Sequence, residues 1–200
     1  ATYRQSSLPN ITAAKIDADN RLLWRKTPLR LEAEEIRDAV LVATGQLNTV
    51  VGGVGYRDVR HFQFRGSNFY ESIDESGPES RRRTIYRFSP RGGRNPFLDT
   101  FDCPDPSVTT PKRAATTTPL QALALMNNAL VFQMADDFAN RMEREAGNST
   151  AAQINLIYVV AYAREANRQE VETAAGFVTE HGLAAFCRVI LNSNEFLYVR

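Results

Sequence analysis

The sequence predicts a mainly α-helical protein, a bundle of about four to five helices with a long irregular segment, carrying short strands, wrapped on it. Helix-start signals followed by apolar residues at helical spacing occupy residues 27–47 and most of 118–193. Between them, residues 48–117 are interrupted repeatedly by glycine and proline. With 200 residues, of which 43% are hydrophobic, the chain is long and apolar enough to bury a core.

The domain boundaries follow from the same change of pattern. Residues 1–26 are polar and irregular, and we expect an N-terminal extension or the remnant of a preceding domain, with Trp24 anchored in the core. Residues 27–200 are expected to form a single helical domain, in which residues 48–117 are the long irregular insertion. No apolar run approaches the roughly 18 to 20 residues of a membrane span, so none is expected in this segment.

The first helix is expected over residues 27–47. Thr27 is suited to the N-cap, and Pro28 to the first helical position, where the missing backbone N–H costs nothing. Apolar side chains then recur at helical spacing at Leu29, Ala33, Ile36, Val40, Ala43 and Leu47.

Two stretches of the irregular segment alternate in the manner of strands. They are "YRDVRHFQF" (56–64) and "RRRTIYRFS" (81–89), and the rest of 48–117 is expected to be loop. Long loops of this kind often carry function.

The third part of the chain is helical from residue 118. Thr118, Pro119 and Gln121 form a capping-box signature, and the helix they begin carries an apolar stripe as far as Met142. Asn127 falls on that stripe, where we expect a kink or a cap within the helix.

Three more helices follow this one. Thr150 and Gln153 indicate the start of the next, Asn167 and Glu170 that of another, and residues 183–193 form a short last helix. Four helices joined by short loops imply antiparallel packing around one core.

The charge balance limits the classes of partner. The formal net charge is +1, so no overall field favours nucleic acid or an anionic membrane, and we expect no nucleic-acid partner. Of the 24 basic residues 21 are arginine, which reflects either the composition of the genome or a surface for anions. His61 and His181 lie outside any metalloprotease or catalytic-triad motif, and His181 suits the last turn of a helix.

Cysteine usage gives no cofactor motif. Cys103 and Cys187 show neither CxxC nor CxxCH spacing, so no zinc knuckle or c-type haem is encoded and no cofactor is expected in this chain. Two unpaired thiols are favoured over a disulfide.

Arginines and aromatic residues alternate between Arg57 and Arg94, with nine arginines against five acidic residues. The mixture suits stacking on single-stranded nucleic acid, or on sugars whose acidic groups bind guanidinium. The alternative is that the rings anchor a long loop on the helical core, and we prefer it. The aromatic residues are Phe62, Phe64, Phe69, Tyr70, Tyr86 and Phe88.

The stretch "FDCPDPS" concentrates acidic side chains. Asp99, Asp102 and Asp105 are weak candidates for a metal site, because irregular loops rich in carboxylates bind hard cations, although EF-hand spacing is missing. Aspartate next to proline more often makes a turn that fixes a loop. We therefore expect Asp102, Asp105 and Arg113 to hold the irregular segment against the start of the Thr118 helix.

A resemblance to a known family rests on four blocks that follow one another from about residue 19 to the end: "NRLLWRKTPLRLEAEEIRDAVL", "RRRTIYRF", "FDCPDPSVTTPKRAATTTPLQALALMNN" and "CRVILNSNEFLYV". Through them the chain resembles the planctomycete-type surface domain, a C-terminal domain of unknown function in large bacterial proteins. The resemblance implies an extracytoplasmic setting, in the periplasm or at the cell surface, and a parent protein in which haem c is bound by other modules. It brings no established activity.

The resemblance also supplies candidate binding residues, which are the family's recurrent polar positions as they fall in this sequence. Many relatives have alanine where this chain has Cys103, which argues against an obligatory disulfide or metal site at that position. The candidate polar cluster consists of Arg82, Arg83, Tyr86, Asp102, Asp105, Arg113, Gln121 and Asn127.

The expected function is that of a non-catalytic binding module of an exported multidomain protein. Its expected partners are other domains of the parent chain, the redox domains among them, or an acidic polysaccharide. The alternative is an enzyme domain acting on a carbohydrate or ester, with Asp102 and Asp105 as acid and base or as metal ligands. Exposure of these two carboxylates in an open cleft favours the enzyme, whereas burial against arginines argues against it.

Overall fold

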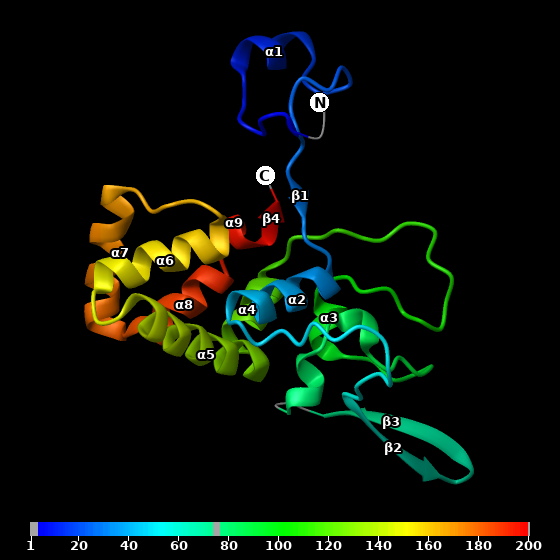
Figure 1. Cartoon of the computed structure of the whole chain (residues 1–200). Coiled ribbons are helices and arrows are strands. Elements are labelled where there is room, and N and C mark those ends of the chain that lie inside the picture. The colour runs from blue at the N-terminus through cyan, green and yellow to red at the C-terminus, as the bar shows by residue number, and fades with distance from the viewer. Residues whose placement is uncertain (1–3, 74–76, 200) are drawn as a thin grey trace.

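The computed structural model describes residues 4–73 and 77–199, and it confirms that the protein is mainly α-helical (Figure 1). Within this part of the chain, no helix combines the length and the apolar character that a membrane span requires. The elements are α1 (Ile11–Ile16), β1 (Leu29–Arg30), α2 (Ala33–Ala43), β2 (Val59–Phe64), β3 (Ser67–Ser72), η2 (Pro78–Arg81), η3 (Thr84–Tyr86), α3 (Pro96–Thr100), α4 (Pro119–Asn127), α5 (Ala129–Ala146), α6 (Thr150–Tyr162), α7 (Arg168–His181), α8 (Leu183–Leu191), α9 (Asn194–Leu197) and β4 (Tyr198–Val199).

The core lies among α5, α6, α7 and α8, with α2 and α4 packed on α5. Burial of apolar side chains in this core is the main source of the fold's stability. The largest apolar side chains that are almost fully buried are Phe138, Ile36, Leu41, Leu125, Met134, Met142, Ile154, Ile157 and Leu191.

The first helix of the body begins later than predicted. Leu29 and Arg30 form β1, which pairs antiparallel with β4 at the C-terminal end, so Thr27 is not the N-cap. Glu32 caps α2 instead, in a capping box with Glu35. The N-cap of α6 is likewise Ser149 and not Thr150.

The helix predicted from residue 118 is divided in two. The capping box of Thr118 and Gln121 is confirmed, but α4 ends at Asn127 and α5 begins at Ala129. Asn128 lies between them in an extended conformation, and its Oδ1 accepts a hydrogen bond from the N–H of Leu130. The interruption was expected at Asn127, but Asn128 is the residue that caps α5.

Replacing Asn128 by alanine is expected to destabilise the protein by about 1 kcal/mol, the usual cost of losing an N-cap side chain. Asn127→Ala is the matched control, because Asn127 is exposed and its side chain bonds only the carbonyl of Leu123 in its own helix. We expect that control to stay within about 0.5 kcal/mol of the wild type. Urea unfolding measures both, and equal losses would contradict the assignment of the cap.

Arg164 joins the ends of three helices at the C-terminal side of the bundle. Its guanidinium donates to both carboxylate oxygens of Glu170, at 2.8 and 2.9 Å, and to both of Glu195, at 2.7 and 2.9 Å. Glu170 also closes the capping box of α7 with Asn167, as predicted. The hydrogen bonds from Arg164, and then that from the Asn167 N–H, lower the pKa of Glu170 to about 2.

This lowered pKa predicts a loss of stability in acid. A carboxylate whose pKa is lower in the folded state stabilises the protein above its unfolded pKa, and the effect disappears as the pH falls through the folded pKa. We expect the contribution of Glu170 to be lost between pH 4.5 and about 2. Thermal unfolding of Glu170→Gln, which keeps a capping side chain, should therefore depend less on pH in this range, and identical profiles would exclude the effect.

Only one of the two strand regions predicted in the irregular segment forms a strand. The stretch 56–64 supplies β2, which pairs with β3 in an antiparallel hairpin, whereas the prediction of a strand over 81–89 is wrong. This region holds the last residue of η2, all of η3, and isolated β-bridges at Arg82 and Arg87, because its backbone bonds side chains of α2. Arg37 donates to the carbonyls of Ser80 and Arg82, and Asp38 accepts from the N–H of Thr84 at 2.7 Å.

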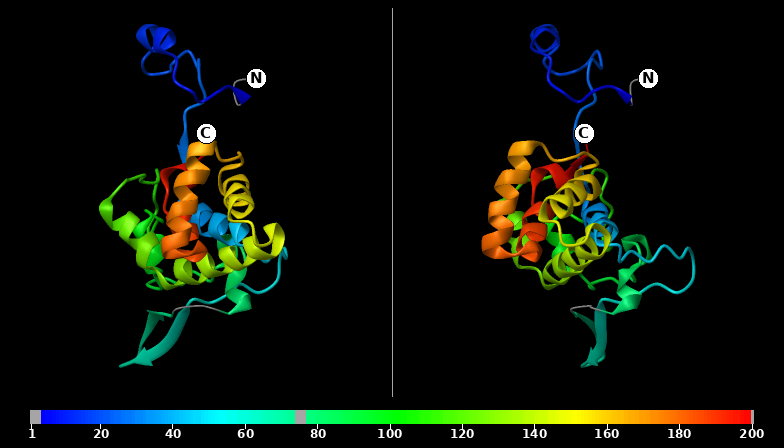
Figure 2. Two further views of the ribbon diagram at one scale, coloured as in Figure 1. Left: turned by 90° about the vertical axis from the view of Figure 1, so that its left-hand side faces the viewer. Right: turned by 60° about the vertical axis from the view of Figure 1, so that its left-hand side comes forward.

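The N-terminal segment lies apart from the helical body, connected to it through β1 (Figure 2). None of the residues of α1 is buried. Trp24 was expected to be a core anchor, but it is half-buried and donates its indole N–H to the carbonyl of Asp17 within the same segment. The prediction that residues 1–26 form an extension remains a prediction.

Candidate functional site

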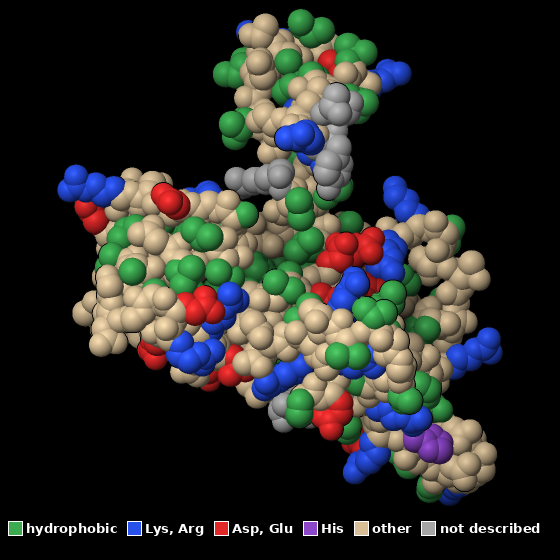
Figure 3. Space-filling model, in the orientation of Figure 1, with side chains coloured by type: hydrophobic (Ala, Val, Ile, Leu, Met, Phe, Trp, Pro, Cys, Tyr) green, Lys and Arg blue, Asp and Glu red, His purple; other side chains and the backbone are tan. Residues whose placement is uncertain are grey.

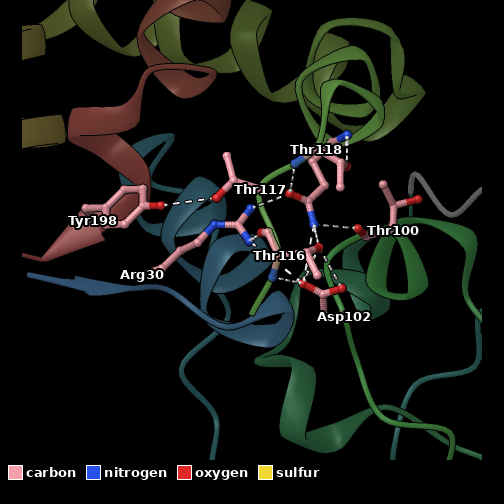
Figure 4. A network of polar contacts seen from close by, with 8 residues as sticks. Arg30, Thr100, Asp102, Thr116, Thr117, Thr118 and Tyr198 are labelled. Atoms are coloured by element: carbon pink, nitrogen blue, oxygen red, sulfur yellow. Dashed lines mark hydrogen bonds and ion pairs between the residues drawn. The ribbon is translucent and has the colours of Figure 1, made fainter. Parts of the chain in front are cut away.

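Asp102 lies at the centre of a polar network that holds the irregular segment (Figure 4). Its backbone has a φ of +64°, a left-handed conformation that aspartate tolerates better than most residues. Its carboxylate accepts hydrogen bonds from the N–H of Thr116 at 2.7 Å and from the side chain of Gln121 at 3.4 Å. The guanidinium of Arg30, in β1, lies 3.9 Å away.

Gln121 connects this network to α4. Its Oε1 accepts from the N–H of Thr118 in the capping box and from Arg30 at 2.9 Å, while its Nε2 donates to the carbonyl of Thr100 at 3.0 Å. The side chain is only 3% exposed, so these bonds are shielded from water. Tyr198 of β4 reaches the same region through Thr117, 3.3 Å between hydroxyls. The network therefore fixes four distant segments to one another.

Asp102→Asn keeps the left-handed backbone but replaces the charged carboxylate by a neutral amide, which has only one acceptor oxygen. We expect a loss of about 1 to 2 kcal/mol in the free energy of unfolding, because two of the partners are partly or fully buried. Asp105→Asn is the control, and its urea midpoint should match that of the wild type, because Asp105 bonds at the surface. Equal midpoints for both variants would show that the Asp102 network holds nothing in place.

Asp105 and Asp99 face a different arginine. Asp105 accepts from the N–H of Ser107 at 2.8 Å, and Arg94 donates to both Asp105 and Asp99 at 2.8 Å. The pKa of Asp105 is lowered, first by the Ser107 backbone and then by Arg94. Asp102 therefore reaches the start of α4 as predicted, whereas Asp105 does not. No three His, Cys, Asp or Glu side chains are grouped as a metal site requires anywhere in the described part of the chain.

Arg113 was expected to contact the start of α4, but it contacts α2 instead. Its guanidinium donates to both carboxylate oxygens of Glu34, at 2.8 and 3.0 Å, and lies 2.8 Å from Glu32. Burial acts to raise the pKa of Glu34, but the hydrogen bonds and charge of Arg113 outweigh it, and the pKa is lowered. The pair fixes the stretch after "FDCPDPS" to the first turn of α2.

Arg82 organises a loop of its own. It is 8% exposed, its guanidinium packs 4.1 Å from the ring centre of Tyr86, and it donates to the carbonyls of Val50, Gly52 and Val54. Arg83, by contrast, is exposed and lies 3.5 Å from a carboxylate oxygen of Asp38. Of the eight predicted binding residues, Asp102 contacts Gln121 and Arg82 contacts Tyr86. The other four have different partners: Arg83 pairs with Asp38, Asp105 with Arg94, Arg113 with Glu34, and the exposed Asn127 bonds Leu123.

A pocket of about 440 Å³ lies between α2, η3, α3 and the stretch 103–113. Acidic and basic side chains lie next to each other on the surface near α2 (Figure 3). Of the eight predicted binding residues only Arg83 and Arg113 line the pocket, and no pattern in the sequence singles out Glu34 or Asp38. The charged residues of the lining are Glu32, Glu34, Glu35, Asp38, Arg83, Arg87, Arg94, Asp99 and Arg113.

Cys103 also lines this pocket, with its sulfur 3.7 Å from Glu34. Burial, and then the charge of Glu34, raise the pKa of the thiol to about 11. The thiol is therefore protonated near neutral pH and is a poor nucleophile. Glu34 and Asp99, which also line the pocket, are bonded to Arg113 and Arg94, so neither is placed as a free base for this thiol.

The β2–β3 hairpin is a second candidate site, on a part of the chain that extends away from the helices (Figure 1). Arg65 and Gly66 form a two-residue turn in which both φ angles are positive, as this tight hairpin turn requires. Phe62, Phe64 and Phe69 share one face and are 44%, 57% and 43% exposed. Their rings contact one another, with centroids 5.6 Å apart for Phe62 and Phe69.

The other face of the hairpin is polar. His61 lies 2.9 Å from the Oδ1 of Asn68, to which Gln63 also donates at 3.2 Å. The aromatic rings of this region were expected to anchor a loop on the core, but these three phenylalanines face solvent. Contiguous exposed apolar surface of this kind marks an interaction site. Alternation in the sequence predicted the strand but not that its apolar face is uncovered.

The fold and these sites define a mainly helical domain whose irregular segment is fixed by internal polar bonds and presents an aromatic hairpin. The chain belongs to the family described as "PSD1: Protein of unknown function (DUF1553)", whose model matches residues 1–178. The match includes the N-terminal segment and ends within α7, three residues before its last residue, His181. No curated protein and no solved structure matches the chain.

Proposed function

We propose that this chain is a non-catalytic interaction module of an exported bacterial multidomain protein, and that the phenylalanine face of the hairpin contacts another domain of the same parent. The observation that carries the proposal is the exposure of Phe62, Phe64 and Phe69 side by side on a projecting hairpin. Aromatic rings that become buried on contact dominate the binding energy of many interfaces. The open strand edges of the hairpin add backbone donors and acceptors for a partner strand.

A protein partner fits the hairpin better than an acidic polysaccharide does. Arg60 is paired across the strands with Glu71, and Arg65, in the turn, lies 5.2 Å from the ring centre of Phe64. Few cationic groups of the hairpin therefore remain to bind the repeated negative charges of such a polymer, whereas the three rings suit an apolar surface. Among domains of a parent protein that carries haem c, a redox domain is the partner we propose.

The setting of the proposal comes from the resemblance of the four sequence blocks. It supports an extracytoplasmic location, in the periplasm or at the cell surface, and a longer parent chain with haem c bound elsewhere. Membership of a family of unknown function supports the domain assignment and leaves its partner and its location to experiment.

The enzyme alternative has weaker support in the geometry. Asp102 is bonded to Thr116 and Gln121 beside Arg30, while Asp105 is bonded to Arg94, so the two carboxylates do not face a common cleft. An acid and base pair must reach the same substrate. This arrangement favours structural roles for both residues.

The test is a binding assay between this chain and the separately produced domains of its parent, together with an array of acidic polysaccharides. Saturable binding to one parent domain, lost when the hairpin face is made polar, is the expected result. Binding only to acidic polysaccharide, or to none of the parent domains, would overturn the proposal. Hydrolysis of a carbohydrate or ester by the purified chain would favour the enzyme instead.

A further inference from the structure

A second cavity, of about 90 Å³, lies at the base of the hairpin, where the hairpin meets α3 and the junction of α4 with α5. A single water needs only about 10 to 15 Å³ of such space, so the cavity has room for a larger group. None of its residues belongs to the candidate binding set. Its lining consists of Arg37, Tyr56, Asp58, Ser72, Ile73, Asn95, Pro96, Phe97, Asn128 and Leu130.

The lining separates into a buried floor and an exposed mouth. Arg37, Tyr56, Asp58 and Phe97 are each at most 6% exposed, while Ser72 at the mouth is exposed. The mouth is therefore reached from solvent beside β3, and the floor combines two aromatic rings with charged and polar groups.

Asp58 has an incomplete set of hydrogen bonds. Its Oδ2 accepts from Arg87 at 2.5 Å and from Asn95 at 2.7 Å. Its Oδ1 is buried and has no hydrogen-bond partner among the residues that the structure describes. Buried acceptors are almost always paired, so we expect a donor from outside the chain, a water or a ligand hydroxyl, to bond this atom.

The charges around the cavity are balanced, which decides the class of donor. Asp58 is neutralised by Arg87, and the guanidinium of Arg37 lies 3.9 Å from Asp38. Arg37 already donates to backbone carbonyls and to Thr84, so its hydrogen bonds are committed. A cationic ligand would lie beside two guanidinium groups and an anionic one beside the Asp58 carboxylate, so a neutral donor fits best.

We propose that this cavity binds a neutral hydroxyl-bearing molecule, a small polyol or one sugar unit. A ligand hydroxyl donates to Oδ1 of Asp58, and the ligand's C–H face packs on the rings of Tyr56 and Phe97. Ser72 adds a hydroxyl at the mouth, and Asn128, whose Oδ1 caps α5, adds its amide N–H groups to the lining. The site is separate from the phenylalanine face and does not depend on the proposed protein partner.

The test uses the whole chain with glycerol and neutral hexoses as probes, and with a uronic acid and an alkylamine as charged comparators. Saturation-transfer NMR and calorimetry should show saturable binding of a neutral probe and at least tenfold weaker binding of both comparators. Ser72→Leu, which fills the mouth, should abolish the binding, and Ser72→Ala, its matched control, should preserve it. Asp58→Asn should weaken binding at least tenfold.

The outcomes separate the proposal from its alternatives. If the folded wild type binds no neutral probe, or if Ser72→Leu binds as tightly as Ser72→Ala, the cavity holds only water and the proposal is overturned. Preference for either charged comparator overturns it as well. Because Asp58→Asn also removes the pairing with Arg87, thermal unfolding checks its fold, and the Ser72 pair decides the question if that variant unfolds.

Discussion

Replacing Phe62, Phe64 and Phe69 together by threonine is expected to weaken binding of the parent-domain partner by at least about 100-fold. Each ring that becomes buried at an interface contributes on the order of 1.5 to 3 kcal/mol, and about 1.4 kcal/mol corresponds to tenfold in affinity. Losses at one interface are not additive, so the expected minimum is set below their sum. Titration calorimetry measures the change directly.

Threonine is chosen because it is polar but retains the strand preference of a β-branched residue. The three rings contact each other and not the helical core, so the thermal midpoint should stay close to that of the wild type. The control places threonine at His61, Gln63 and Asn68 on the opposite face of the same strands. Equal affinities for the two triple variants would exclude the phenylalanine face as the contact surface.

Arg37→Met is expected to destabilise the protein by about 3 kcal/mol. Arg37 is 6% exposed, and its guanidinium satisfies the carbonyls of Ser80 and Arg82 and the hydroxyl of Thr84. Methionine fills the volume of the aliphatic stem but leaves these buried acceptors unpaired, at about 1 to 3 kcal/mol for each group that finds no water. Urea unfolding gives the size of the loss.

The matched control is Arg83→Met, on the segment that Arg37 holds. Arg83 is exposed and pairs only loosely with Asp38, so its replacement should cost less than about 1 kcal/mol. Hydrogen exchange should show faster exchange at the N–H of Thr84 and its neighbours in Arg37→Met only. A small loss in that variant would mean that the segment is held by its other contacts.

Local signals predicted the elements whose ends are fixed locally. The capping boxes at Thr118 and Asn167 involve residues three apart, and both helices begin where the sequence places them. The predicted start of the first helix is wrong because Leu29 pairs with Val199 at the far end of the chain, a contact that no nearby residue indicates. Long-range pairing overrides local preference in such cases.

The strand predicted over 81–89 failed for a related reason. Its alternation is real, but the buried Arg37 and the partly buried Asp38 bond its backbone from α2, and the stretch forms the short helix η3 instead. Nothing in the sequence around Arg37 indicates that this side chain is buried.

The candidate site was predicted in part. The sequence placed Asp102 near the start of the Thr118 helix, and the structure brings it to Gln121. Arg30, which completes that network, lies 72 positions before Asp102 in the sequence. The candidate residues supplied by the family resemblance did not include it. The exposure of Phe62 was not predictable either, because alternation shows which side chains share a face but not what covers that face.

The two thiols provide probes of local opening in each half of the molecule. Cys103 lies in the irregular segment and Cys187 in the helical core, and both are free. Burial, with nearby carboxylates, raises the thiol pKa to about 11 for Cys103 and to about 12 for Cys187. Both thiols are therefore protonated at neutral pH and react slowly with an alkylating reagent as long as their surroundings stay folded. The alkylation rate of each cysteine thus reports how often its own region opens, and comparing the two rates shows whether the irregular segment detaches before the bundle unfolds.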